Sequence, residues 1–495
     1  MDQEKIAKTI EGLKPAISAV TDPNARAIIE VLIQCIEAQQ KQITELQEKL
    51  NINSSNSSNP PSTNRFKSGS SGSKGNKGGG KGKPGGQPGH KGVSRELLPE
   101  KEVDYIEQHQ PPAICACGGL VEDLRCYQRH QVHELPPIKI VVTEHQLMRG
   151  SCGLCGQEHR AELPDHVPSG MLGPYLLALI ATLTSDYKMS KRDVVRLFTD
   201  LFNLSLSVAT IKRAEETVSS AIKPLVEEAK VFVQQQEMVN CDETSHSECG
   251  KKRWTWVAIA SSVAVFMIAA TRSTKAAKAL LGEAFQGILG SDRYSAYTWV
   301  AAHCRQVCWA HLIRDFKKIS ERGGQSQRIG WRLLVYTRRM FRLWHAVRDG
   351  TLTRPVFKEK MKPIRHAIET LLLDGTNVDH DKTKGTCKEL LKIKGALWTF
   401  IEVVGVEPTN NLAERVLRKI VIWRKVCFGT WSTNGTLYLE RVMTVVATCR
   451  LQNRSVFHFL HDAIQAHLNN IDPPSLLPSK SLEQKSEIFD LATAA

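Results

Sequence analysis

The order of strands and helices after residue 236 constrains the fold of this chain more than any other feature. Two segments rich in Val and Ile are separated by a Ser pair, which is typical of two consecutive buried strands. The pattern predicts strands at 237–241, 254–260, 263–270, 287–290 and 305–310, with a helix at 274–285 and a further helix after residue 292. Strands and helices in this order predict an α/β core.

Two aspartates follow strands of this core. Asp242 and Asp292 come just beyond the first and fourth predicted strands. The predicted order is three strands, a helix, a strand, a helix and a strand. In a ribonuclease-H-like mixed sheet with this order, the first and fourth strands are neighbours at the centre. The two aspartates then face one another. Glu243 competes with Asp242, because strand ends read from sequence are uncertain by a residue or more. Adjacent side chains on a strand point to opposite faces, so only one of them can belong to the site.

A third carboxylate arrives on a helix. Residues 407–415 read Glu-Pro-Thr-Asn-Asn-Leu-Ala-Glu-Arg, and Thr409 or an Asn would cap the helix that places Glu414 in its early turns. Most Asp and Glu side chains are merely solvated, but three at these positions form the hard oxygen set that suits Mg²⁺ or Mn²⁺. Two such ions roughly 3.5 to 4 Å apart catalyse phosphoryl transfer. We predict that Asp242, Asp292 and Glu414 are catalytic metal ligands.

A long basic segment separates the second aspartate from the glutamate. Residues 311–400 are helix-patterned and carry many arginines, so they predict a helical insertion in the core. The predicted core then consists of residues 233–310 and 401–468, followed by a tail at 469–495. The insertion must return Glu414 to the two aspartates.

The N-terminal region, residues 1–50, contains a heptad repeat. Ile or Leu occupies every position of the seam from 29 to 50 except Gln39, with steps of three and four residues. This pattern favours a coiled coil and therefore a homodimer or higher oligomer, with Gln39 as a polar position that sets the register. An amphipathic helix packed on its own domain is the alternative.

A basic tract without periodicity follows at 51–97. Between Arg65 and Lys91 seven basic residues and ten glycines occur with no acid, so the tract cannot bury enough apolar surface to fold alone. It can neutralise phosphates without reading sequence, or act only as a solvated linker. The formal net charge of +15 likewise indicates a polyanionic partner, with nucleic acid ahead of an anionic membrane.

Paired cysteines mark a small module at 98–168. Thiolates this close in sequence can reach one tetrahedral Zn²⁺, and the adjoining glycines let the backbone turn. Only one residue separates the first pair, which leaves Cys126 as a substitute ligand, and free buried thiols are the alternative. Val/Ile alternation at 131–145 predicts a pair of strands between the cysteine pairs. The predicted zinc ligands are Cys115, Cys117, Cys152 and Cys155.

A helical region at 169–232 contains two helices joined by a short turn. Residues 190–202 and 207–218 resemble a helix-turn-helix, with Ser207 as the second N-cap. The second helix would present Thr210, Lys212 and Arg213 to DNA, although helix pairs of this kind occur in any helical domain.

The sequence favours a protein without a membrane span. The apolar run at 254–270 is short for a bilayer helix and breaks at its Ser pair. No signal peptide opens the chain, so we expect a cytoplasmic, bacterial and nucleoid-associated protein in which the 13 cysteines do not form a disulfide framework.

These residues resemble the transposases of the insertion sequence 66 family. The resemblance covers nearly the whole chain and includes the leading heptads and the paired cysteines. It is carried by the motifs Lys83-Pro-Gly-Gly-Gln-Pro-Gly-His-Lys-Gly92, Asp242-Glu-Thr244, Ser291-Asp-Arg-Tyr294 and Pro408-Thr-Asn-Asn-Leu-Ala-Glu-Arg415. It implies a DDE-type enzyme whose metal ligands are Asp242, Asp292 and Glu414. Cys308 and His311 resemble a C-x-x-H feature that supports the active site in several such enzymes.

The resemblance implies DNA strand cleavage and strand transfer. The DNA partners would be the element's terminal inverted repeats and a target, with accessory proteins as further partners. Arg415, Arg418 and Arg424, which surround Glu414 in sequence, would hold DNA near the metals, although helix-surface arginines are often only solvated. An inactive or domesticated DNA-binding regulator and a simple nuclease are the alternatives, and the intact acidic triad favours the transposase.

Overall fold

The computed structural model describes residues 12, 15–17, 19–50, 56, 96–164, 167–168 and 170–478. Most of the predicted basic linker at 51–97 and the end of the predicted tail therefore lie outside the described residues. The chain divides into two compact units, one made of Met1–Arg65 and Thr143–Ala495 and the other of Phe66–Val142.

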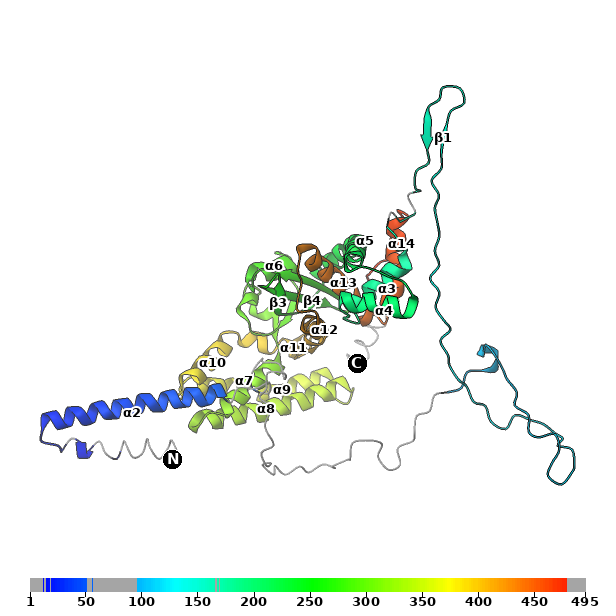
Figure 1. Ribbon diagram of the computed structural model, residues 1–495. Helices are drawn as coiled ribbons and strands as arrows, with labels where there is room; N and C mark the ends of the chain where they lie inside the picture. Colours follow the sequence, from blue (N-terminus) through cyan, green and yellow to red (C-terminus); the bar gives the residue numbers. More distant parts are fainter. Residues whose placement is uncertain are drawn as a thin grey trace. The chain divides into compact units, whose positions relative to one another are not determined.

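A five-stranded mixed sheet forms the centre of the larger unit (Figure 1). The central strand pairs antiparallel with β4 and parallel with β6, and the full order is β5-β4-β3-β6-β7. This order confirms the predicted mixed sheet and is compatible with a ribonuclease-H-like core. The strands are β3 (Met238–Glu248), β4 (Lys251–Ala260), β5 (Val263–Ala269), β6 (Ile288–Ser291) and β7 (Arg305–Val307).

The first strand is longer than the sequence predicted. We expected β3 to end before Asp242, but it continues to Glu248 because it pairs with β4 as far as Glu248 opposite Lys251. Cys249 and Gly250, both with positive φ, close this hairpin in two residues, as the right-handed twist of paired strands favours.

The connection between β6 and β7 also differs from the prediction. Instead of an α-helix it contains two 3₁₀ turns, η3 (Ser295–Tyr297) and η4 (Ala302–Cys304). The strands they join have only four and three residues, so a short crossover is enough to return the chain. The predicted fifth strand also stops early, at Val307, because the next helix begins at Trp309.

A helix covers the edge of the sheet through a row of polar contacts. On α13 (Thr433–Leu451) the side chains of Glu440, Thr444 and Thr448 accept the N–H groups of Ile268, Phe266 and Ala264 on the edge strand β5. Four residues of helix rise about 6 Å and two residues of strand nearly 7 Å, so the two rows stay in step. The N–H groups of an edge strand are thereby satisfied within the chain.

The remaining core helices share one apolar core with the sheet. Ser190 and Ser207 cap α4 and α5 by accepting N–H groups, and Asn203 turns the chain between them with φ 49°. However, α5 extends over 27 residues and packs its apolar face against α13, so the DNA-reading role remains a prediction. These helices are α3 (Pro174–Ser185), α4 (Lys191–Phe202), α5 (Val208–Gln234), α6 (Thr274–Leu281), α12 (Asn411–Cys427), α13 (Thr433–Leu451) and α14 (Val456–Leu468).

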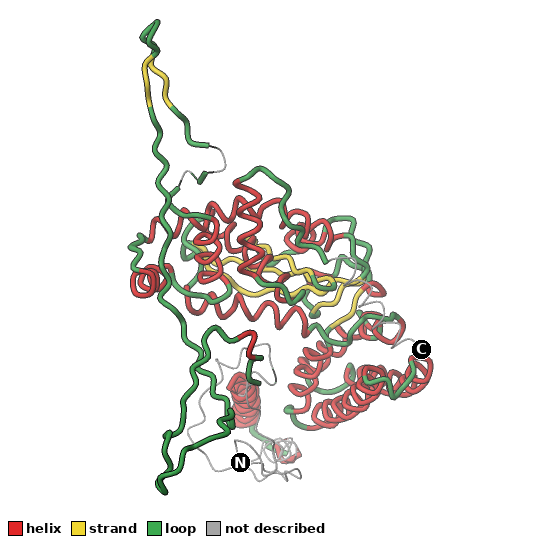
Figure 2. Tube along the Cα trace, turned by 90° about the vertical axis from the view of Figure 1, so that its right-hand side faces the viewer, coloured by secondary structure: helices red, strands yellow, loops and turns green. Residues whose placement is uncertain are grey.

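A second apolar core lies in the helices between β7 and α12. Trp309, Trp344 and Phe400 are among its buried side chains. In Figure 2 these helices gather at one end of the sheet rather than on its faces. They are α7 (Trp309–Ser320), α8 (Gly324–Arg348), α9 (Arg354–Gly375), α10 (Asp381–Lys392), η5 (Lys394–Leu397) and α11 (Thr399–Glu402).

The N-terminal helix forms where the heptad repeat lies. α2 (Pro23–Leu50) is continuous over 28 residues. Its seam residues Leu32, Ile36, Ile43 and Leu46 are 42 to 57% exposed in the single chain. The helix is thus observed, whereas its pairing with a second copy remains a prediction.

The region around the cysteine pairs has little regular structure. Besides a 3₁₀ turn, η2 (Glu100–Glu102), it contains the antiparallel pair β1 (Arg149–Ser151) and β2 (Glu158–Arg160). The strands predicted at 131–145 were wrong, because that run has no strand pairing with any described residue and Val132, Val141 and Val142 are exposed. The observed strands flank the second cysteine pair instead.

Residues 254–270 form β4 and β5, as predicted, with the Ser pair at their turn. Among the described helices, none combines the length and apolar character that crossing a bilayer requires.

Candidate active site

The pairing of the central strands sets Asp242 beside Asp292. The parallel ladder between β3 and β6 runs from Met238 opposite Ile288 to Asn240 opposite Gly290. Two residues further along each strand come the two aspartates, at matching register. Asp242 thus lies within β3 rather than beyond its end, but at the point where the neighbouring strand stops.

Asp242 lies in an electronegative pocket. Burial raises the pKa of its carboxyl well above the usual value, and the carboxylates of Glu243, Asp292 and Glu414 raise this pKa further. Its Oδ1 accepts the N–H of Glu243 at 2.9 Å. Asp292 and Glu414 thus act electrostatically on Asp242, and a bound cation would relieve this repulsion.

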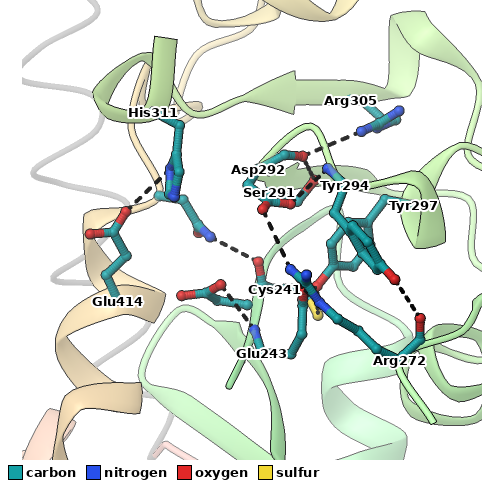
Figure 3. A network of polar contacts seen from close by, with 12 residues as sticks. Cys241, Glu243, Arg272, Ser291, Asp292, Tyr294, Tyr297, Arg305, His311 and Glu414 are labelled. Carbon is teal, nitrogen blue, oxygen red and sulfur yellow. Dashed lines mark hydrogen bonds and ion pairs between the residues drawn. The ribbon is translucent and has the colours of Figure 1, made fainter. Parts of the chain in front are cut away.

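Glu243 is tied to Asp292 through Arg272, which contacts both carboxylates. Its fully buried carboxylate forms an ion pair with Arg272 and accepts the hydroxyl of Tyr297 (Figure 3). Burial raises the pKa of Glu243, and Asp292 adds to the rise. With both oxygens engaged, Glu243 is a poorer candidate for a metal ligand than Asp242.

Asp292 is held by its backbone and by Arg272. Its Oδ1 accepts the N–H of Tyr294 at 2.9 Å, and its Oδ2 is 3.8 Å from the Arg272 guanidinium. Arg272 lies over the Tyr294 ring, 3.6 Å from the centroid, and its carbonyl accepts the Tyr294 hydroxyl. Arg305 donates to the Asp292 carbonyl at 3.4 Å. The loop after β6 is thus fixed from both sides.

Asn410 attaches the third carboxylate's helix to the sheet. Its side-chain amide donates to the Cys241 carbonyl at 2.8 Å, and its backbone N–H donates to Cys308 Sγ at 3.1 Å. Asn410 is the N-cap residue of α12, but its side chain does not cap that helix. Because this amide reaches β3 one residue before Asp242, it brings the first turn of α12, and with it Glu414, to the aspartates.

His311 and Arg314 approach Glu414 from α7. His311 Nδ1 is 3.5 Å from Glu414 Oε1, and the Arg314 guanidinium is 3.8 Å from Oε2. Burial lowers the pKa of His311, although Glu414 and Asp292 oppose that shift, and burial raises the pKa of Cys308 to about 11. The ligand atoms of Cys308, His311 and Glu414 all lie within 4.8 Å of one another.

The donor set fits divalent cations. Asp242, Asp292 and Glu414 supply hard carboxylate oxygens, which suit Mg²⁺ and Mn²⁺. Within the described residues Glu414 Oε1 is buried without a hydrogen-bond partner, so it has a lone pair free for a ligand. Sequence reasoning did not identify Asn410, Arg272 or Tyr297 as supporting residues. Asn410 falls within a quoted motif, whereas no local pattern marked Arg272.

The residues predicted to contact DNA lie on two different helices, α5 and α12. On α5, Thr210 bonds to the Ser207 cap, Lys212 pairs with Glu216 at 3.4 Å, and Arg213 is exposed. On α12, Arg415 and Arg418 are exposed, while Arg424 donates to Ser245 at 2.8 Å. Their DNA contacts remain predictions.

Each cysteine pair forms a tight turn of its own. At the first pair, Gly118 has φ +89° and its N–H donates to the Cys115 carbonyl, while the amide of Gly119 lowers the pKa of Cys117. At the second, Gly156 has φ +74° and donates to the Cys152 carbonyl. Amides of Cys155 and Leu154 lower the pKa of Cys152. Amides that face sulfur favour the thiolates that zinc requires, so a shared zinc site remains a prediction.

A mixed sheet of this order with carboxylates at the end of its central strands is compatible with a class of enzymes that process nucleic acids. The sequence comparisons identify the family within that class. A family profile described as "Transposase IS66 family" matches residues 169–437, more than half of the chain. The chain belongs to the IS66 transposase family.

Two further similarities were found. A profile described as "Family of unknown function (DUF6444)" matches residues 13–96. The chain is 25% identical over 411 residues to "Uncharacterized protein y4hP" of Sinorhizobium fredii (strain NBRC 101917 / NGR234), a match that covers 74% of this chain and 72% of that relative.

Proposed function

We propose that this protein is a DNA transposase that cleaves the ends of a bacterial insertion sequence and joins them to target DNA. Asp242, Asp292 and Glu414 are its catalytic metal ligands. The proposal is supported by the electrostatic influence that Asp292, after β6, and Glu414, on α12, exert on Asp242 of β3 in a chain of the IS66 transposase family.

The chemistry divides between metal and protein. A pair of Mg²⁺ or Mn²⁺ ions, when bound, supplies activation of the attacking water or 3′-hydroxyl and stabilisation of the leaving oxygen. The protein's own groups hold the ligands in place. Asn410 fixes α12 on β3, Arg272 lies 3.8 Å from Asp292, and His311 lies 3.5 Å from the Glu414 carboxylate.

Cleavage assays with ligand variants test the assignment. With Mg²⁺ and DNA that carries the element's terminal repeats, we expect the wild-type chain to cleave at the ends and transfer them. Asp242→Ala and Glu414→Gln should reduce both activities to background while DNA binding persists, because only the metal ligands are lost. Glu243→Gln is the neighbouring control and should retain more activity than Asp242→Ala. Full activity of Asp242→Ala would refute the assignment.

The main competing function is that of a DNA-binding regulator without catalytic activity. An inactive or domesticated regulator would bind the terminal repeats without cleaving them, and a simple nuclease would cleave but not join. The assay separates the three, since it scores binding, cleavage and joined product independently. The intact acidic set favours the transposase.

We also propose that Cys115, Cys117, Cys152 and Cys155 hold one structural Zn²⁺. Bound zinc per chain, measured on protein purified without added metal, should fall by one equivalent in the Cys152→Ser, Cys155→Ser double variant. Cys249→Ser, at the exposed hairpin turn, is the control and should leave the zinc content unchanged. Full zinc content in the double variant would contradict a four-cysteine site.

A further inference from the structure

The helix α8 carries an arginine-rich surface that the proposed catalytic site does not use. Its 25 residues include six arginines and no acidic residue. Arg328, Arg332, Arg339 and Arg342 recur at helical spacing and are all exposed. With Arg338 they occupy one side of the helix, because the opposite side is buried in the second apolar core.

These arginines are not neutralised within the described part of the chain. Of the six, Arg348 approaches a carboxylate, Glu407, at 3.9 Å, whereas the described residues provide no ion pair for the other five. On α9 and α10, by contrast, Lys362 pairs with Glu359 and Lys392 with Glu389. Unopposed like charges on one face repel one another, so an anionic partner would stabilise them.

The basic surface is continuous with the helix beside the candidate active site. A hollow of about 710 Å³ between α7 and α8 has charged lining residues and an apolar floor that includes Phe341; the charged residues are Lys317, Glu321, Arg338 and Arg342. The same α7 presents Arg314 to Glu414 at 3.8 Å. A polyanion on α8 can therefore extend along α7 toward the carboxylates.

We propose that the exposed face of α8 binds the phosphodiester backbone of duplex DNA and so anchors the substrate beside the active site. This inference rests on the proposed function. From Arg328 to Arg342 the helix rises about 21 Å, which exceeds the roughly 12 Å width of the major groove. The arginines can therefore reach phosphates on both sides of a groove. Exposed Trp331 adds an apolar surface beside Arg332 for the sugars.

The salt dependence of DNA affinity tests this assignment. The Arg332→Gln, Arg339→Gln, Arg342→Gln triple variant and the wild type are compared in an Asp242→Ala background, by fluorescence anisotropy with an element-end duplex and a random duplex. Each phosphate contact contributes a slope of about 0.9 to the plot of log affinity against log salt concentration. We expect the triple variant to lower the slope by roughly 2 to 3 and to weaken both duplexes equally, since phosphate contacts carry no sequence information.

A charge-matched variant serves as the control. Lys360→Gln, Lys362→Gln, Lys388→Gln removes three positive charges from α9 and α10 of the same insertion, and its slope should change by much less. Circular dichroism and thermal unfolding check that both variants fold. If the arginine variant and the control give the same slope, the assignment of α8 is overturned. If the parent chain binds no DNA at all, the proposed function fails with it.

Discussion

Arg272 separates two acidic side chains that have different roles. Its guanidinium forms an ion pair with buried Glu243 and lies 3.8 Å from Asp292, while its ring contacts with Tyr294 and Trp254 fix its position. Burial and Asp292 both raise the pKa of Glu243, and Arg272 opposes that rise. The cation thus opposes the protonation of Glu243 inside the core, close to the proposed metal ligands.

Removal of Arg272 should therefore destabilise the protein in a pH-dependent way. Arg272→Met leaves a buried carboxylate without its cation, which costs about 3 to 5 kcal/mol. A carboxyl whose folded pKa lies above its unfolded pKa loses stability as pH rises between the two values, so the deficit should grow as pH rises above the ordinary range of a glutamate. Thermal unfolding of the metal-free protein measures it. The Glu243→Gln, Arg272→Met double variant removes the charge and should recover part of the loss, and no recovery would contradict this account.

Individual residues were predictable only where a local pattern marked them. Asp292 and Glu414 follow recognisable strand and helix signals in the sequence. Asp242 was selected over Glu243, but its location inside a long strand was missed because the hairpin partner β4 determines where β3 ends. Arg272 and Tyr297 had no local signal, since their roles depend on contacts with Glu243 that are 29 and 54 residues distant.

At the scale of elements, one of the contacts between α13 and the edge strand β5 is made by a titratable side chain. Glu440 of α13 accepts the N–H of Ile268, beside the equivalent contacts of Thr444 and Thr448. Burial raises the pKa of Glu440 to about 7, although the Ile268 amide opposes the rise. Periodicity predicted the strand at 263–270, but neither α13 nor the alignment of its polar groups with that strand, which depends on tertiary packing.

This contact predicts how stability changes with pH. The folded state holds a proton on Glu440 up to about pH 7, whereas the unfolded chain releases it near pH 4.5, so stability should fall as pH rises through this range. The loss amounts to about 3 kcal/mol. Glu440→Gln keeps an oxygen for the Ile268 amide and should flatten this part of the profile in urea unfolding. Thr444→Val, which loses an uncharged acceptor, should lower stability equally at every pH; an unchanged slope in Glu440→Gln would contradict the assignment.

At the scale of the whole molecule, the chain contains two separate apolar cores and an exposed N-terminal helix. The sheet and its helices hold the three carboxylates, and the α7–α11 helices form a separate core between Asp292 and Glu414. The sequence predicted this insertion from its length and basic, helical pattern. It did not predict how Glu414 returns to the site, because the Asn410 contacts that achieve this join residues more than 100 positions apart.

The exposed apolar seam of α2 predicts that two copies of the chain pair through this helix. Joining two element ends to a target requires two active sites close together, and a coiled coil between two copies would provide them. Ile36→Asp with Ile43→Asp places like charges in the seam, so light scattering should show the mass fall to that of one 55.2 kDa chain. Gln34→Asp with Gln42→Asp adds the same charge off the seam and should leave the assembly intact. If both variants keep the wild-type mass, α2 does not pair two copies, and the active sites must be brought together by another surface.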